Sequence, residues 1–184
     1  VDMLTFTGHK IHGLVGCGCL VKRKSLTLMP IINGGGQEFG LRSSTLDIAN
    51  ISVLTYALKT SIKEGKNHFD SVSKLSTLLY EYLSKHPEKY HINSNNKNPY
   101  IVNFSTISKK GSVVVEALSR NGIMVSSTSA CSSYKEKGSY VVESINSDPN
   151  VFNNTIRVSF SYLNTVSEIE TFIKILDKII EEIR

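Results

Sequence analysis

Alternation between helical and extended apolar patterns is the feature that most restricts how this chain can fold. From about residue 66 onward, some segments carry apolar side chains at helical spacing, and short strand-like runs separate them. The last helix begins at a capping box, Thr165-Val166-Ser167-Glu168, whose side chains accept hydrogen bonds from the free backbone N–H groups of a helix start. Such alternation predicts a compact α/β or α+β unit. The predicted strands are 100–107, 123–125 and 155–160, and the predicted helices are 69–83, 112–120 and the segment after Thr165.

The first 65 residues carry a different pattern, in which two strands precede a glycine-rich loop and a helix. Residues 1–7 and 16–22 read as strands joined by a tight turn, and residues 46–63 read as an amphipathic helix. Gly65 then marks an expected hinge before the next helix. The loop 33–45 holds four glycines and one arginine, which offer backbone N–H groups and a guanidinium to an anion. A flexible connector with the same composition is the competing interpretation.

Composition restricts the class of protein further. The chain has 184 residues, 40% of them hydrophobic and 20% charged, which is enough for one domain with a good core or for two small domains. No apolar run approaches the roughly 20 residues of a membrane span, and the start lacks the pattern of a signal peptide. We therefore expect a cytoplasmic protein that does not bind a membrane. Strand-like sequence from Val1, without an initiator methionine, suggests that an N-terminal part of a longer protein is missing.

Charge and cysteine content argue against nucleic-acid binding and against a disulfide or metal framework. The net charge of +5 comes from 21 Lys and Arg against 16 Asp and Glu, and apart from residues 22–24 the basic side chains are scattered. Three cysteines, an odd number, in a chain without a secretion signal do not suit disulfides. Cys17 and Cys19 share one face of a strand and are expected to pack as small hydrophobic side chains. We predict no metal site, because no second Cys or His pair stands at zinc spacing.

The turn Thr7-Gly8-His9-Lys10, just past the first strand, is the first candidate site. A lysine in a turn, with a hydroxyl, a glycine and an imidazole beside it, suits a neutral amine held close to an anion. The competing interpretation is a solvated lysine next to a turn histidine. We predict that Lys10 forms a Schiff base with pyridoxal phosphate, and that Thr7 and His9 hold the phosphate of this cofactor.

Two further motifs lie downstream. Residues 126–133 place Cys131 among hydroxyl groups, without apolar side chains that would anchor the loop, and the strand 155–160 carries Arg157. Together with Lys10 and the glycine-rich loop, these motifs stand in an order that resembles the C-terminal half of a cysteine desulfurase, a pyridoxal-phosphate enzyme of the class V aminotransferase fold. The resemblance covers essentially the whole chain.

The resemblance implies an architecture as well as a set of roles. It implies the C-terminal part of a fold-type I pyridoxal-phosphate transferase of α/β class. Residues 1–65 would be the end of the large cofactor-binding domain, and residues 66–184 would be the small C-terminal α/β domain. Cys131 would be the nucleophile that carries a persulfide, and Arg157 would hold the α-carboxylate of cysteine. Thr45 would contact the cofactor phosphate of the partner subunit in a homodimer.

The implied activity is desulfuration of L-cysteine to L-alanine, with the sulfur passed as a persulfide to an acceptor, either an iron–sulfur scaffold or a carrier for thiolated nucleotides. Two other functions stay open: another class V aminotransferase or lyase that leaves Cys131 unused, and a non-catalytic dimerisation or interaction module. Ser44 and Thr128 stand where the family has glycines, so we expect changed loop geometry there. The groups that would contact the cofactor ring are expected upstream of Val1, so this piece alone is expected to be inactive.

Overall fold

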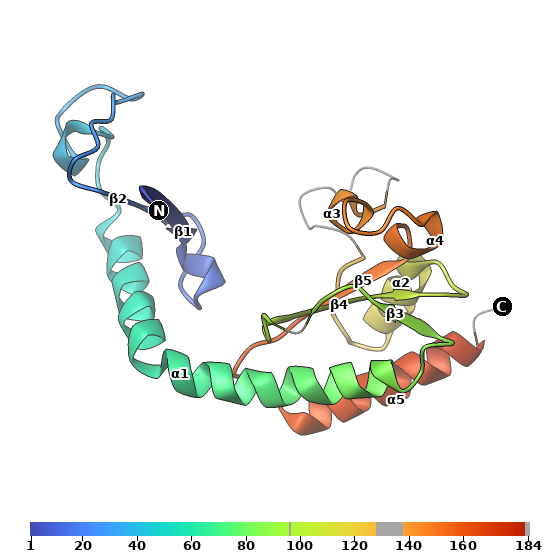
Figure 1. The fold of residues 1–184 in the computed structure, drawn as a ribbon. Helices are drawn as coiled ribbons and strands as arrows, with labels where there is room; N and C mark the ends of the chain where they lie inside the picture. The colour runs from blue at the N-terminus through green and yellow to red at the C-terminus, as the bar shows by residue number, and fades with distance from the viewer. Residues whose placement is uncertain (96, 128–137, 183–184) are drawn as a thin grey trace. The chain divides into compact units, whose positions relative to one another are not determined.

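The computed structural model describes residues 1–95, 97–127 and 138–182 and divides into two compact units, 1–65 and 66–184 (Figure 1). Each unit contains its own antiparallel sheet, of two strands in the first unit and three strands in the second. The chain passes from the first unit to the second within one helix, α1 (Ile48–Ser84). The fold is therefore of mixed α/β class, as predicted.

The first unit is built on a two-stranded ribbon of β1 (Met3–Thr7) and β2 (Gly18–Lys22). The strands pair from Met3 opposite Lys22 to Thr7 opposite Gly18, so both predicted strands are confirmed, each beginning slightly later than expected. A short 3₁₀ helix, η1 (Gly8–Lys10), follows β1 directly. The candidate lysine thus stands at the end of a paired strand.

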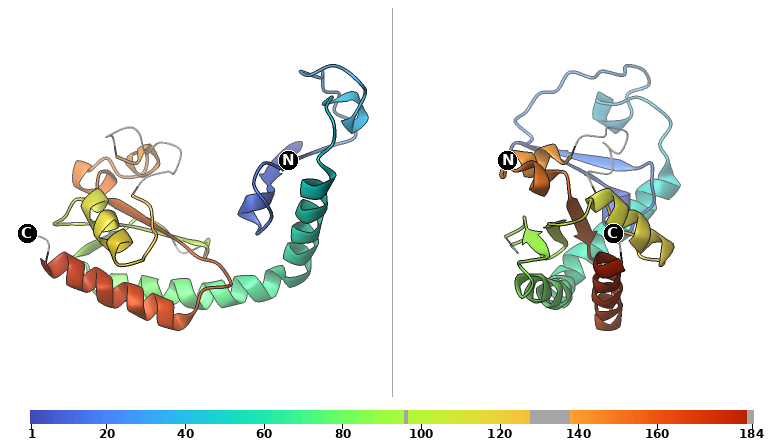
Figure 2. Two further views of the ribbon diagram at one scale, coloured as in Figure 1. Left: turned by 180° about the vertical axis from the view of Figure 1, so that it is seen from behind. Right: turned by 90° about the vertical axis from the view of Figure 1, so that its right-hand side faces the viewer.

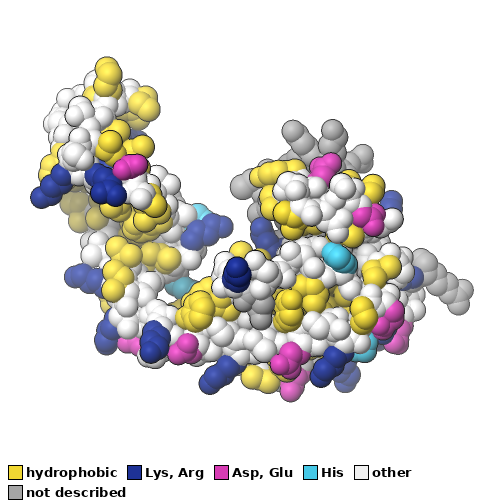
Figure 3. Space-filling view, in the orientation of Figure 1, with side chains coloured by type: hydrophobic (Ala, Val, Ile, Leu, Met, Phe, Trp, Pro, Cys, Tyr) yellow, Lys and Arg dark blue, Asp and Glu magenta, His cyan; other side chains and the backbone are white. Residues whose placement is uncertain are grey.

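The glycine-rich loop of the first unit is folded back on itself. Ser43 is buried, and its backbone N–H donates to the carbonyl of Ile32 over 3.2 Å. A second 3₁₀ helix, η2 (Glu38–Gly40), contains Phe39, which has a φ of 59° and a side chain that is 99% exposed. Figure 3 shows how much hydrophobic surface this unit presents to solvent.

Helix α1 runs through Gly65, where a break between two helices was expected and where the two compact units meet. The helix continues through this residue without a break and has 37 residues. A glycine inside a helix costs only about 1 kcal/mol relative to alanine, which its neighbours in the helix can offset. Within the first unit, Leu54 and Ala57 are buried, whereas Ile48 and Ile62 of the same predicted apolar face are 72% and 75% exposed.

The second unit contains a three-stranded antiparallel sheet in the order β3 (Tyr90–Ile92), β4 (Ile101–Thr106) and β5 (Thr155–Ser159). Strands β4 and β5 match the predicted segments, but β3 was not predicted because three residues are too few for a period-2 pattern. The predicted strand 123–125 is wrong. Only the following residue, Ser126, forms an isolated bridge, which pairs it with Arg157 on the outer edge of β5.

Helices cover both faces of this sheet (Figure 2). The second half of α1, α2 (Gly111–Arg120) and α5 (Val166–Glu182) pack on the face that bears Val102, Phe104 and Ile156. These residues and the buried side chains of the three helices form the main core. The other face carries two short helices that the sequence did not predict, α3 (Tyr140–Glu143) and α4 (Pro149–Phe152).

The predicted capping box at the start of α5 is confirmed. The backbone N–H of Thr165 donates to Glu168 Oε2 over 2.7 Å, and the backbone N–H of Glu168 donates to Thr165 Oγ1 over 3.3 Å. The bond from Thr165 lowers the pKa of the Glu168 carboxyl below its ordinary value. The helix that follows buries Ile169, Phe172, Leu176, Ile179 and Ile180 in the core, as its spacing predicted.

Candidate functional site

The Lys10 turn is held in place by backbone hydrogen bonds that converge on Gly8. The carbonyl of Gly8 accepts from the backbone N–H groups of Ile11 and Gly13 at 3.0 and 2.8 Å. The backbone N–H of Gly8 donates to the carbonyl of Cys17 over 3.0 Å. A Cβ atom at Gly8 would lie 3.0 Å from the carbonyl oxygen of Leu14, so this close turn favours glycine. The backbone that carries Lys10 is therefore fixed from both sides.

The hydrogen bonds of Thr7 orient the imidazole of His9. Thr7 Oγ1 donates its single hydrogen to the carbonyl of Cys17 at 3.1 Å, and it lies 3.0 Å from His9 Nδ1. Since the hydroxyl hydrogen is already used, Thr7 Oγ1 must accept from Nδ1, which therefore carries a hydrogen. The second ring nitrogen, Nε2, is left for another group. The structure thus brings Thr7 and His9 into contact, and their role in holding a phosphate stays a prediction.

The amine of Lys10 is exposed and makes no hydrogen bond or ion pair with any residue of the described ranges. One short turn therefore offers a primary amine and an imidazole nitrogen. An aldehyde that also bears a phosphate needs an amine and an anion-binding donor close together. With its hydrogen on Nδ1, His9 can donate from Nε2 to a phosphate only when the imidazole is protonated, and Thr7 gives its hydroxyl hydrogen to the backbone. The turn therefore fits pyridoxal phosphate through the Lys10 amine and the protonated form of His9.

Thr45 belongs to the same unit but forms no hydrogen bond with the Lys10 turn among the described residues. It is exposed just before α1, and its carbonyl accepts a hydrogen bond from Ser44 Oγ at 3.2 Å. The neighbouring Arg42 donates to the carbonyl of Ser43 at 3.2 Å, so its guanidinium is partly used within the loop. A role for Thr45 across a subunit interface stays a prediction.

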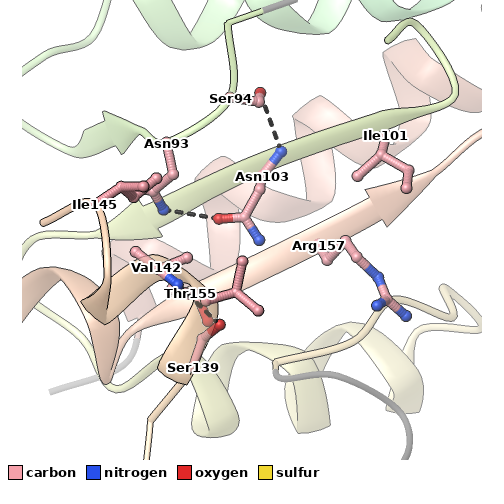
Figure 4. Close-up of a pocket in the computed structure, with 10 residues that line it drawn as sticks. Asn93, Ser94, Ile101, Asn103, Ser139, Val142, Ile145, Thr155 and Arg157 are labelled. Atoms are coloured by element: carbon pink, nitrogen blue, oxygen red, sulfur yellow. Dashed lines mark hydrogen bonds between the residues drawn. The ribbon is translucent and has the colours of Figure 1, made fainter.

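Arg157 lies in the second unit, on the sheet face opposite the core. It stands on β5 directly opposite Asn103 of β4, and its backbone exchanges hydrogen bonds of 2.7 and 3.2 Å with Ser126. Its side chain lines a cavity of about 220 Å³ together with Asn93, Asn103 and Thr155 (Figure 4). Arg157 Nε is buried and has no hydrogen-bond partner among the described residues. A buried guanidinium nitrogen without a partner favours an anionic ligand.

Cys131 lies outside the described residues, but the residues on both sides of segment 128–137 are attached near this cavity. Thr155 Oγ1 donates to the carbonyl of Ser127 at 2.6 Å. At the other end, the backbone N–H of Ser139 donates to the carbonyl of Phe152 at 2.9 Å. Ser127 is thus bonded to β5, and Ser139 is bonded to α4, the helix that directly precedes β5.

The remaining predictions concern cysteines, metals and membranes. Cys17 and Cys19 are both half-buried free thiols at β2. Within 1–95, 97–127 and 138–182, no group of three or more metal-ligating side chains is gathered at one place. Over the same ranges, no helix has the length and apolar character needed to cross a membrane.

Asn93 and Asn103 are cavity residues that the sequence interpretation missed. A signal for Asn103 was present, because it lies between Val102 and Phe104, both of which are fully buried. Strand periodicity places Asn103 on the opposite face, where Arg157 also points. Asn93 follows a strand of three residues, which left no comparable signal.

Residues 1–172 match the family model of aminotransferase class-V. A NifS/IcsS protein homolog of Lactobacillus delbrueckii subsp. bulgaricus is 34% identical over 182 residues, which are 97% of this chain and 47% of that protein. The cysteine desulfurase IscS of Buchnera aphidicola subsp. Baizongia pistaciae is 33% identical over 188 residues, covering 100% of this chain and 46% of that protein. The NifS-like protein from Rickettsia africae superposes with a TM-score of 0.87 at 28% identity, covering 98% of this chain and 48% of that one. The chain thus spans about half the length of the relatives it matches.

Proposed function

The chain belongs to the aminotransferase class-V family, and on this premise we propose that its protein is a pyridoxal-phosphate-dependent cysteine desulfurase. The reaction would convert L-cysteine to L-alanine and leave the sulfur as a persulfide on Cys131. The observation that supports this proposal most directly is the Lys10 turn, a backbone-fixed turn with an exposed amine beside an oriented imidazole. Relatives named cysteine desulfurase align with the whole length of the chain.

The residues of the first unit would hold the cofactor. Lys10 Nζ would bind it and move a proton to or from the α-carbon of the substrate, while His9 Nε2 and the Thr7 turn would hold the phosphate. Pyridoxal phosphate, when bound, would supply the electron withdrawal that weakens bonds at the α-carbon and at the sulfur-bearing carbon of cysteine. Thr45 would contact the phosphate bound by the second subunit of a homodimer.

The residues of the second unit would handle the substrate and its sulfur. Arg157 would orient the α-carboxylate by bidentate hydrogen bonds, which suits its unpartnered Nε. The Cys131 thiolate would attack the sulfur of cysteine, so that an S–S bond forms while the C–S bond breaks. The electron pair of the C–S bond stays on carbon, which takes up a proton and becomes the methyl group of alanine.

These roles suggest how the protein is organised in the cell. Residues 1–65 would be the end of the large cofactor-binding domain, and residues 66–184 the small C-terminal domain. An acceptor protein, such as an iron–sulfur scaffold or a sulfur carrier, would take the sulfur from Cys131. A thiol that must stay reduced between turnovers suits the cytoplasm.

Product analysis tests the proposal. The protein as it occurs in the cell, with whatever chain accompanies these residues there, should release alanine from cysteine and carry one added sulfur on the Cys131 peptide. The variant Cys131→Ser should keep the cofactor but deliver no sulfur, because a hydroxyl cannot carry a persulfide. Transamination or lyase products with an unmodified Cys131 would show another class V enzyme. If the protein neither binds the cofactor nor turns over cysteine, a non-catalytic interaction module is the remaining function.

A further inference from the structure

A chain of side-chain hydrogen bonds runs across the polar face of the second unit's sheet and ends beside Arg157. It begins at the carbonyl of Val151 in α4, which accepts from Ser105 Oγ at 2.8 Å. Asn93 Nδ2 lies 2.8 Å from Ser105 Oγ and 2.8 Å from Asn103 Oδ1. The chain therefore links α4, β4 and the residue after β3, and its last member is Asn103.

The direction of every bond in this chain follows from its first acceptor. A carbonyl can only accept, so the one hydrogen of Ser105 is used on Val151 and its oxygen must accept from Asn93. The atom that Asn93 presents is then its amide nitrogen, and the second hydrogen of that nitrogen goes to Asn103. Asn103 must therefore face Asn93 with its oxygen. The hydrogen-bond network therefore fixes the orientation of this amide.

The consequence is that Asn103 presents its amide N–H groups on the side away from Asn93. Figure 4 shows this nitrogen on the cavity side of the residue. Asn103 Nδ2 has no hydrogen-bond partner among the described residues. Asn103 and Arg157 are directly opposite each other on β4 and β5, a position in which Cβ atoms lie about 4.5–5.5 Å apart. Both side chains line the same cavity of about 220 Å³.

We propose that Asn103 and Arg157 form one carboxylate-binding site, to which Asn103 Nδ2 and the guanidinium of Arg157 each donate. Donors from neighbouring positions on β4 and β5 can together meet the two oxygens of a carboxylate. Asn103 Nδ2 is held in place by the hydrogen-bond network, whereas the guanidinium of Arg157, which extends away from Asn103 in Figure 4, turns toward the ligand. Asn93 and Ser105 are positioning residues that keep the donor of Asn103 turned toward the ligand. The identity of the ligand as the α-carboxylate of cysteine rests on the proposed function, whereas the carboxylate chemistry rests on the cavity itself.

The substitution Asn103→Asp tests the site with almost no change of shape. It keeps the oxygen that accepts from Asn93 and replaces only the free donor with a negatively charged oxygen. The probe is 3-mercaptopropionate, which has the carboxylate and thiol of cysteine but no amino group, and its neutral amide is the reference ligand. In the protein as it occurs in the cell, the variant should raise the calorimetric Kd for 3-mercaptopropionate at least about ten- to hundred-fold, because the ligand loses one charge-assisted hydrogen bond and is also repelled by the new negative charge. The Kd for the neutral amide should not change.

Turnover gives a second measurement, because a lost ground-state contact should raise KM for cysteine and change kcat less. Asn121→Asp is the matched control, since it adds the same charge to an exposed asparagine of the second unit that lines neither this cavity nor the hollow beside it. This control should leave both Kd and KM unchanged. If Asn103→Asp fails to fold, Asn103→Ala should show the same loss of probe binding with a smaller factor.

Each outcome separates this inference from the proposed function. Probe binding that depends on Arg157 but not on Asn103 would overturn the shared site, even if cysteine is desulfurated normally. Equal affinity of the wild type for the acid and its amide would also overturn it. If no alanine forms from cysteine but 3-mercaptopropionate binding depends on both residues, the desulfurase proposal fails and the carboxylate site stands.

Discussion

The two units differ strongly in how many of their hydrophobic side chains are buried. In residues 1–65, Leu54 and Ala57 are the only buried hydrophobic side chains, and large apolar residues such as Phe39 and Ile62 are exposed. In the second unit, two helices and the end of α1 cover one sheet face and enclose a continuous core. The hydrophobic core of the second unit stabilises that unit, whereas in the first unit a few backbone hydrogen bonds hold the Lys10 turn.

Within residues 1–65, the backbone of the Lys10 turn is fixed although few hydrophobic side chains of these residues are buried. The Lys10 turn is closed by hydrogen bonds to one glycine, and no large hydrophobic cluster supports it. The Arg157 cavity is the opposite case, because its residues stand on strands whose other face forms the core. Function and stability should therefore respond to different substitutions in the two units.

The largest effect is expected at Lys10. In the protein as it occurs in the cell, Lys10→Ala should abolish both cysteine turnover and the visible absorbance of bound cofactor, because it removes the amine that would bind the cofactor. The free energy of unfolding should stay within about 0.5 kcal/mol, since the side chain is exposed. Absorbance spectroscopy, alanine release and urea denaturation measure these three quantities. Lys24→Ala, an exposed lysine in the same unit, is the control, and an active Lys10→Ala protein would remove Lys10 from the mechanism.

The next largest effect is expected on stability rather than on activity, and in the second unit. Phe104→Ala should lower the free energy of unfolding by about 3–5 kcal/mol, because Phe104 is fully buried in the core of the second unit. Ile62→Ala, at an exposed position of the first unit, should change it by about 0.5 kcal/mol or less. Urea denaturation of both variants measures the difference. Equal losses would show that the apolar surface of the first unit is covered in the whole protein.

A smaller effect is expected at the cavity. Arg157→Lys should raise KM for cysteine about tenfold, because lysine keeps the charge but loses the planar fork that binds both carboxylate oxygens. Stability should change little, since Arg157 lies on the sheet face away from the core. Steady-state kinetics would measure the effect, and an unaltered KM would exclude a bidentate contact.

The smallest effect concerns the capping box. Thr165→Ala should cost about 1 kcal/mol of unfolding free energy, because the N–H of Glu168 loses its side-chain acceptor. Thr171→Ala, an exposed threonine inside the same helix, should be neutral or slightly stabilising. Thermal or urea denaturation of the pair isolates the cap. Identical shifts for both threonines would mean that the cap contributes nothing beyond helix propensity.

Local patterns were enough to predict the elements whose cause is local. The capping box, the strand around Phe104 and the helix that ends before Gly122 all follow from neighbouring residues, and the structure confirms them. Gly65 misled the prediction because the cost of one glycine was overruled by the helix on both sides of it. The Asn93–Asn103 bond could not be predicted, since it joins residues that only the sheet brings together.

The bridge between Ser126 and Arg157 also has a consequence for how the protein behaves in a crowded solution. Strand β5 is the last strand of its sheet, and an open strand edge invites pairing with another molecule. Ser126 uses the N–H and the carbonyl of Arg157 at the middle of this edge. The opposite edge is β3, which has only three residues. Neither border of the sheet leaves a long row of unpaired backbone groups, so this unit is protected against edge-to-edge aggregation by its own chain.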